Sequence, residues 1–224
     1  MTAKNPQATK RIFLLSPANL SGRRAEILLR EAASFELALR LRSTGAPLGD
    51  VFSFVSGLYF RGKLAYSNTF AEPGKIHDSV FVITATRGLV APHAPIDHTA
   101  LREMAGVPIS CADSRYIGPL ERDLAELARR VSASTKIILL GSIATPKYLQ
   151  PLSRVFGERL LVPLDFVGRG DMSRGALMLR AVREMVQLTY APARSLEPDS
   201  PKPQGRRVKA SSSAHKKKPR EKAP

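Results

Sequence analysis

Four apolar runs along the chain have the length of buried strands. They cover residues 11–15, 79–84, 136–140 and 160–167. The run at 79–84 is rich in β-branched residues, which predicts a central strand. The run at 160–167 contains Pro163, which lacks the N–H that a β-ladder requires, so this strand is expected at a sheet edge or with a bulge. A shorter run at 107–110 is a candidate minor strand.

Between these runs, apolar residues recur at helical spacing. Helices are expected in a stretch that ends near residue 42 and over 50–70, 99–105, 119–131, 146–156 and 173–187. Within 50–70, Gly57 and Gly62 together should cost about 2 kcal/mol relative to alanine. They therefore imply either a break in this helix or a close approach by another part of the chain.

Helix or loop separates each main strand from the next, which is typical of a mostly parallel sheet sandwiched between helices, a three-layer α/β fold. We expect a single α/β domain over 11–192 after a flexible N-terminus at 1–10. The segment 193–224 is rich in proline, serine and lysine and has no apolar period, which predicts a disordered basic tail. A tail that only improves solubility is the alternative interpretation.

The chain is strongly basic, and the charge is not confined to this tail. The net charge is +16, of which nine basic and three acidic residues after position 194 contribute +6, leaving +10 for residues 1–194. A basic body of this kind favours a polyanionic partner such as nucleic acid or a nucleotide. Solubility alone is the competing explanation.

Several classes of protein are disfavoured by composition. The single cysteine, Cys111, cannot form an internal disulfide, and the four histidines are too scattered for a zinc site, so we expect no metal and no cofactor. No apolar run approaches 18 residues and the N-terminus lacks a hydrophobic signal region, which predicts no membrane partner and a cytoplasmic location.

A glycine-bracketed turn at 168–171 joins the last strand to the last helix. Its glycines permit positive φ, and Asp171 or Ser173 could cap the helix that follows. Because a helix N-terminus attracts anions, Arg169 and Arg174 beside this turn suit a phosphate or carboxylate. Asp171 would then orient an arginine or act as a base; alternatively, it only caps the helix and the arginines are solvated.

The other main strands are also followed by polar residues, and ligands of open α/β sheets usually bind at the carboxyl ends of strands. The candidates are Ser16, Asn19 and Arg23 after the first strand, Arg87 after the second, and Ser142 and Lys147 after the third. Plain polar turns are the alternative. As a catalytic nucleophile Ser142 is weakly supported, because it lacks the G-x-S-x-G elbow and a neighbouring histidine. We expect these loops and the turn at 168–171 to meet at one edge of the sheet.

Arg61 lies in the stretch GLYFRGK at 57–63, which mixes aromatic, basic and small residues as nucleic-acid-stacking surfaces do. Core packing of Tyr59 and Phe60 is the alternative explanation for the aromatic residues.

Three segments, LLSPANLSGRR, GLYFRGKLAY and VFVITATRGLVAPHAPI, resemble a group of small bacterial α/β proteins of unassigned function. The fold of that group is likened to the uracil-DNA glycosylase superfamily and to the auxiliary domain of archaeosine synthase. The resemblance covers about residues 11–167 and implies a pocket at the strand ends and a nucleic-acid or nucleobase connection. It does not imply glycosidic-bond cleavage, because Ser16 is followed by proline without the group's usual cysteine, and the water-activating aspartate motif of true uracil-DNA glycosylases is not recognisable.

The sequence thus predicts a nucleic-acid-associated protein that binds phosphate or a nucleotide at the carboxyl edge of its sheet. One alternative is an enzyme that acts on a nucleotide, nucleoside or nucleobase, with Asp171 as its carboxylate. Another is a basic protein–protein adaptor.

Overall fold

The computed structural model describes residues 10–72, 78–143 and 145–196. A six-stranded sheet has the strand order β4-β3-β1-β6-β7-β8. The strands are β1 (Arg11–Leu15), β3 (Val80–Ile83), β4 (Leu89–Val90), β6 (Lys136–Leu140), β7 (Leu160–Pro163) and β8 (Tyr190–Pro192). Strands β3, β1, β6 and β7 are parallel, while β4 and β8 pair antiparallel at the two edges. The predicted mostly parallel sheet is confirmed. The strand in 79–84, which was predicted to be central, is β3 and lies between β1 and the edge strand β4.

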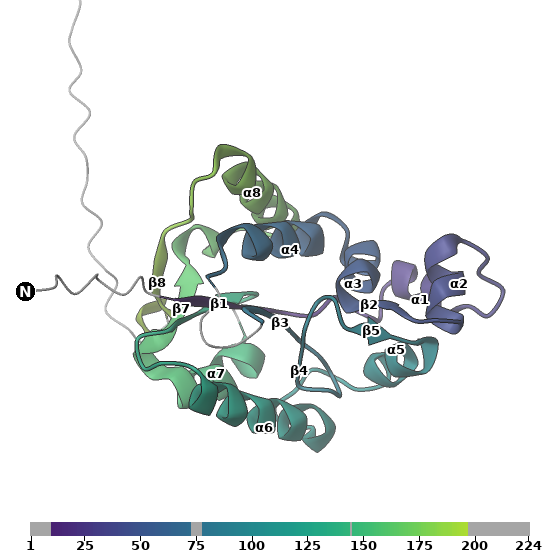
Figure 1. Ribbon diagram of the computed structural model, residues 1–224, viewed down its shortest axis with the longest axis horizontal. Helices are drawn as coiled ribbons and strands as arrows, with labels where there is room; N and C mark the ends of the chain where they lie inside the picture. The colour runs from purple at the N-terminus through teal and green to yellow at the C-terminus, as the bar shows by residue number, and fades with distance from the viewer. Residues whose placement is uncertain (1–9, 73–77, 144, 197–224) are drawn as a thin grey trace, which may run out of the picture.

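Helices cover both faces of the sheet, as Figure 1 shows, which confirms the three-layer α/β prediction. The helices are α1 (Arg23–Leu29), α2 (Glu36–Arg42), α3 (Leu48–Ser56), α4 (Leu58–Phe70), α5 (His98–Ala105), α6 (Ser114–Arg130), α7 (Pro146–Phe156) and α8 (Asp171–Glu184). Helices α4 and α8 lie on one face and α6 and α7 on the other, while α1, α2, α3 and α5 gather at one end, beside the small two-stranded sheet of β2 (Ala46–Pro47) and β5 (Pro95–Ile96). Short 3-10 helices cover Gly157–Arg159, Leu164–Phe166 and Ala193–Leu196.

The alternating direction of the side chains along β1 explains why helices cover both faces of the sheet. Phe13 and Leu15 pack into the core beneath α4 and α8, whereas Ile12 and Leu14 pack into the core beneath α6 and α7. Successive side chains of a strand point to opposite faces, so a strand that is apolar at every position needs a layer of helices on each side.

The last predicted strand differs from expectation at its carboxyl end. Strand β7 ends at Pro163, and a 3-10 helix at Leu164–Phe166 replaces the rest of the apolar run. The strand is not at an edge, because it pairs with β6 on one side and β8 on the other. Pairing with β6 includes Leu160 and Leu161 but does not extend to Pro163, so at Pro163 the ladder continues on the β8 side alone.

Other boundaries were also predicted incorrectly. The stretch before residue 42 forms two helices rather than one, 107–110 forms no strand, and the helix predicted over 119–131 begins at Ser114. The 3-10 helix at Ala193–Leu196 extends past the predicted end of the domain at 192. The predicted flexible N-terminus, except residue 10, and the predicted tail beyond residue 196 lie outside the described residues.

Both consequences expected from the two glycines of 50–70 occur. Gly57 has a φ of +59° and separates α3 from α4. Gly62 lies at the crossing of α4 with α8, where a Cβ atom would be 2.8 Å from the carbonyl oxygen of Gly175. A Cβ on Gly175 would in turn be 2.9 Å from the carbonyl oxygen of Leu58. This contact between backbones holds the first turns of α8 and α4 together, and the candidate site forms beside it.

Candidate ligand-binding site

A cavity of about 590 Å³ lies beyond the carboxyl ends of the parallel strands. Segments that follow all four of these strands line it: 17–21 after β1, Ala85 after β3, Ser142 after β6 and Asp171 after β7. From β1 the chain moves to β3 on one side and then crosses to β6 on the other. Such a reversal of strand order opens a crevice between neighbouring loops, which is where open α/β sheets bind their ligands.

The lining of this cavity combines aromatic and apolar side chains with polar ones. Its aromatic side chains are Phe52 from α3, Tyr59 from α4 and Tyr148 from α7. Met104, Val107, Pro108 and Ile109 add apolar surface, and the polar residues of the lining include Asn19, Ser21, Ser56, Ser142, Lys147 and Asp171. A cavity of this size with a few polar groups on aromatic walls is typical of a site for a small organic ligand.

The Tyr59 hydroxyl is the unusual polar group of this wall. The side chain is buried, and the hydroxyl has no hydrogen-bond partner among the described residues. Burial raises the pKa of Tyr59 to about 12, and the nearby positive charge of Arg174 only partly offsets this, without being placed to complete a hydrogen bond of ordinary geometry. A buried hydroxyl without a partner is destabilising, so this group lowers the stability of the folded protein.

A buried lysine lies directly behind this aromatic wall. Lys63 is 1% exposed, and its Nζ donates to the carbonyl oxygen of Ser16 at 2.6 Å and to the Ser16 hydroxyl at 3.0 Å. The same Nζ lies 4.4 Å from the ring centroid of Tyr59 and 4.8 Å from that of Phe60. Within the described parts of the chain, no carboxylate forms an ion pair with it.

Burial lowers the pKa of Lys63 to about 7, because the charged form loses its hydration. The carboxylate of Asp171 opposes this shift and the guanidinium of Arg174 adds to it. Sequence reasoning noted the stretch 57–63 but did not single out this residue. The sequence feature that could have indicated the burial of Lys63 is its spacing, four residues after Tyr59 and three before Tyr66, which places it on the buried face of the predicted helix.

Ser16 lies beneath the cavity rather than in its lining. It follows β1 directly and is 4% exposed. Gly141, which follows β6, covers it so closely that a Cβ atom at this glycine would lie 2.9 Å from the Ser16 Cβ. The role that the structure gives Ser16 is to accept hydrogen bonds from Lys63.

At the start of α8, the acidic residue Asp171 is exposed and the basic residue Arg174 is buried. Asp171 is the first residue of α8, lines the cavity and keeps 67% of its side chain exposed. Arg174 is buried, and its Nε and Nη2 donate to the carbonyl oxygen of Phe166 at 3.2 and 3.0 Å. Its Nη1 lies 3.5 Å from Oδ1 of Asp171. The arginine therefore fixes the turn and orients Asp171.

The predicted cap of α8 was wrong. Gly170 occupies the N-cap position, and no side-chain hydrogen bond caps the helix. Ser173 is exposed and instead accepts from Nη1 of Arg169 at 3.3 Å.

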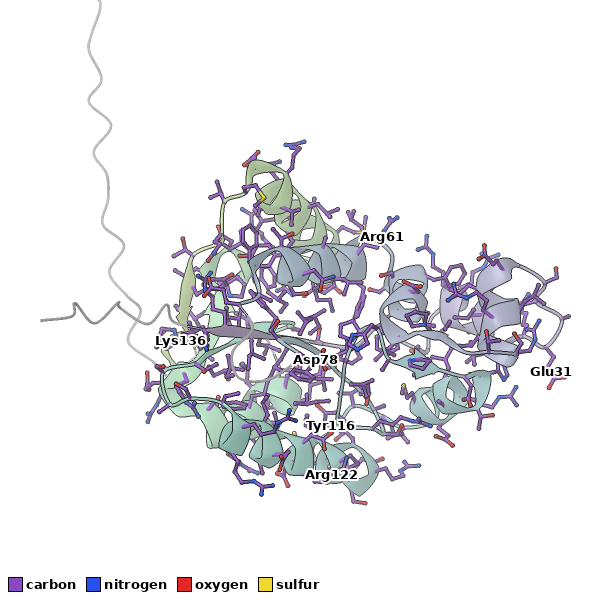
Figure 2. All side chains as sticks on the ribbon, in the orientation of Figure 1. Glu31, Arg61, Asp78, Tyr116, Arg122 and Lys136 are labelled. Atoms are coloured by element: carbon purple, nitrogen blue, oxygen red, sulfur yellow. The ribbon has the colours of Figure 1, made fainter. Side chains whose placement is uncertain are left out.

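Of the other predicted site residues, some meet in the cavity and some do not. The predicted residues in the lining are Asn19, Ser142, Lys147 and Asp171. Those exposed outside it are Arg23, Arg61, Arg87, Arg169 and Ser173, and Figure 2 shows Arg61 close to the junction of α3 and α4. Arg87 forms an ion pair with Glu103 at 3.3 Å. The Asn19 side-chain oxygen accepts from the N–H of Ser21 at 3.1 Å and from its hydroxyl at 2.8 Å, which holds the loop after β1 in shape.

The described residues contain no group of three or more His, Cys, Asp or Glu side chains that could hold a metal ion. None of the helices in the described part of the chain is long and apolar enough to cross a membrane. Comparisons of this chain with protein-family models, with curated proteins and with solved structures found no match.

Proposed function

We propose that the cavity binds a ligand that contains a nucleobase, and that the natural ligand is a nucleotide or a nucleotide within a nucleic acid. The observation that carries this proposal is the wall formed by three aromatic residues in a cavity at the point where the strand order reverses. A nucleobase offers a flat π-face to Phe52, Tyr59 and Tyr148 and polar edge atoms to the polar residues of the lining.

The phosphate of such a ligand has a suitable position at α7. Lys147 lies in the first turn of this helix and in the cavity lining, with its Nζ 5.2 Å from the ring centroid of Tyr148. The first N–H groups of a helix and its partial positive charge add to the attraction of the lysine for an anion. Lys147 and the helix therefore support a phosphate next to the aromatic wall.

The charge of the protein outside the cavity supports a ligand in which the nucleotide is part of a nucleic acid. The exposed arginines outside the cavity and the net charge of +16 support contacts with additional phosphates. A cytoplasmic location belongs to the same proposal, and the single cysteine is compatible with a reducing compartment.

The test is calorimetric and fluorescence titration of the full chain with nucleosides, nucleoside monophosphates and short DNA and RNA strands. Lys147→Met should weaken monophosphate binding about tenfold, the usual loss for one charge-assisted hydrogen bond. Lys136→Met is the matched control, because it removes the same charge from the start of β6, at the opposite end of the strand from the cavity, as Figure 2 shows. Failure of every nucleobase ligand to bind would overturn the proposal and favour the protein–protein adaptor.

A second candidate function, an enzyme that acts on the bound nucleotide, nucleoside or nucleobase, is favoured by Asp171. This carboxylate is exposed in the lining beside the charge of Arg174, where a general base or nucleophile could reach a ligand. Asp171→Asn should then abolish turnover but leave ligand affinity within about threefold of wild type, since a single neutral isostere keeps the local hydrogen-bonding capacity. Equal loss of binding and turnover would contradict a chemical role.

A further inference from the structure

The charge of Lys63 is not neutralised by an acidic partner. The groups that face its Nζ are two oxygens of Ser16 from the end of β1 and the rings of Tyr59 and Phe60 from its own helix. From α8, the carboxylate of Asp171 and the guanidinium of Arg174 act on it with opposite sign. All of these groups except Arg174 favour the ammonium form of Lys63. None of them is a carboxylate in direct contact with its Nζ.

This lysine is one side chain away from the cavity. The Tyr59 ring, 4.4 Å from Nζ, belongs to the cavity wall. Ser16, which holds the ammonium, precedes the lining residues 17–21 directly. A negative charge in the cavity would thus act on Lys63 through aromatic and backbone groups rather than through water, and a low-dielectric path preserves the interaction.

We propose that the cavity takes up an anionic ligand together with a proton, and that Lys63 is the group that holds the proton. The inference rests on the proposed site and narrows its ligand class to anions such as nucleoside monophosphates.

The coupling follows from linkage between the two binding events. Because burial lowers the pKa of Lys63 to about 7, both the amine and the ammonium are accessible in the empty protein near neutral pH. An anion in the cavity favours the ammonium form and raises this pKa; by reciprocity, the ammonium raises the affinity for the anion. A rise of about one unit in pKa corresponds to about tenfold tighter anion binding on the acidic side of the transition than on the basic side.

The direct measurement is NMR titration of the full chain carrying lysine labelled with 13C at Cε. Lys63→Met identifies the resonance, and Lys136→Met is the matched control. The expected result is a titration near pH 7 in the free protein that moves upward by about one unit with a nucleoside monophosphate. The uncharged nucleoside should leave it unchanged. A free-state pKa near the ordinary lysine value would overturn the proposal without depending on any ligand.

Calorimetry in two buffers with different ionisation enthalpies provides the independent readout. Near neutral pH, binding of the monophosphate should take up more protons in wild type and in Lys136→Met than in Lys63→Met, where only the second ionisation of the phosphate itself, at about pH 6, contributes. Nucleotide binding with equal proton uptake in wild type and Lys63→Met would refute the role of Lys63 and leave the proposed function standing. If inorganic phosphate raises the pKa of Lys63 but no nucleobase ligand binds, the proton coupling stands and the proposed function fails. If no anion in the panel binds, both fail.

Discussion

Replacing Lys63 with methionine should change how the stability of the empty protein depends on pH. Methionine keeps a long unbranched side chain in the same space and removes the amine. The folded pKa of Lys63, about 7, lies below the ordinary lysine value of 10.5, so the unfolded chain binds more protons between these values. The free energy of unfolding of wild type must therefore rise with pH across this window.

The size of the change in unfolding free energy follows from how far the pKa of Lys63 is lowered on folding. The lowered pKa corresponds to a destabilisation on the order of 4–5 kcal/mol that is fully present below pH 7 and is relieved as pH rises toward the unfolded value. Between about pH 7.5 and pH 9.5, wild type should gain about 2.5 kcal/mol through this residue. The variant loses this slope, but it leaves the two Ser16 oxygens without their donor, at a cost of about 1–3 kcal/mol. It should be the more stable protein near pH 6, with the advantage shrinking or reversing as pH rises.

The assay is urea unfolding followed by far-ultraviolet circular dichroism at several pH values up to about 9.5. Higher pH is avoided because burial raises the pKa of Tyr116 and Tyr148 in the folded state, so their unfolded forms ionise first and stability falls. The comparison uses the difference between wild type and variant, which cancels groups common to both. Lys136→Met should follow wild type. Parallel curves for wild type and Lys63→Met would refute the claim that the lysine is buried at a cost in the folded state.

Three other substitutions test the packing and the site. Gly62→Ala should destabilise the protein by about 1–3 kcal/mol in thermal unfolding, because the new Cβ would meet the backbone of Gly175. The control is Gly118→Ala in α6, where the space around the glycine is open, and this change should stabilise by about 0.5–1 kcal/mol. Equal effects of the two substitutions would contradict the close crossing of α4 and α8. Asp97→Ala should cost about 1 kcal/mol, measured by urea unfolding, because its side chain caps α5; no loss would show that the cap contributes nothing. Tyr59→Phe should raise the melting temperature of the empty protein by removing a buried, unpartnered hydroxyl; a lower melting temperature would mean that the hydroxyl has a partner.

Local sequence pattern was sufficient where one segment decides its own structure. The strands at β1, β3 and β6 and the helix at α7 were predicted from short apolar runs, helical spacing and a proline at the first helical position. The order of these elements also determined the parallel sheet, since short chain connections allow few alternatives. For the same reason, residues that directly follow parallel strands, such as Asn19 and Ser142, could be predicted to lie at one edge.

The tertiary structure alone decided which side chains face the cavity and which are buried behind it. Strand β8 has three residues, which are too few to show a periodic pattern in the sequence. Because β8 pairs with β7, the strand that contains Pro163 is not at the edge of the sheet. The burial of Lys63 and Arg174 depends on the contact of α4 with α8, whose residues are more than 100 positions apart in the chain. The sequence determined that residues of suitable chemistry follow the strands. Their exposure, partners and pKa values are properties of neighbours that only folding brings together, because desolvation and Coulomb interactions depend on distance in space and not along the chain.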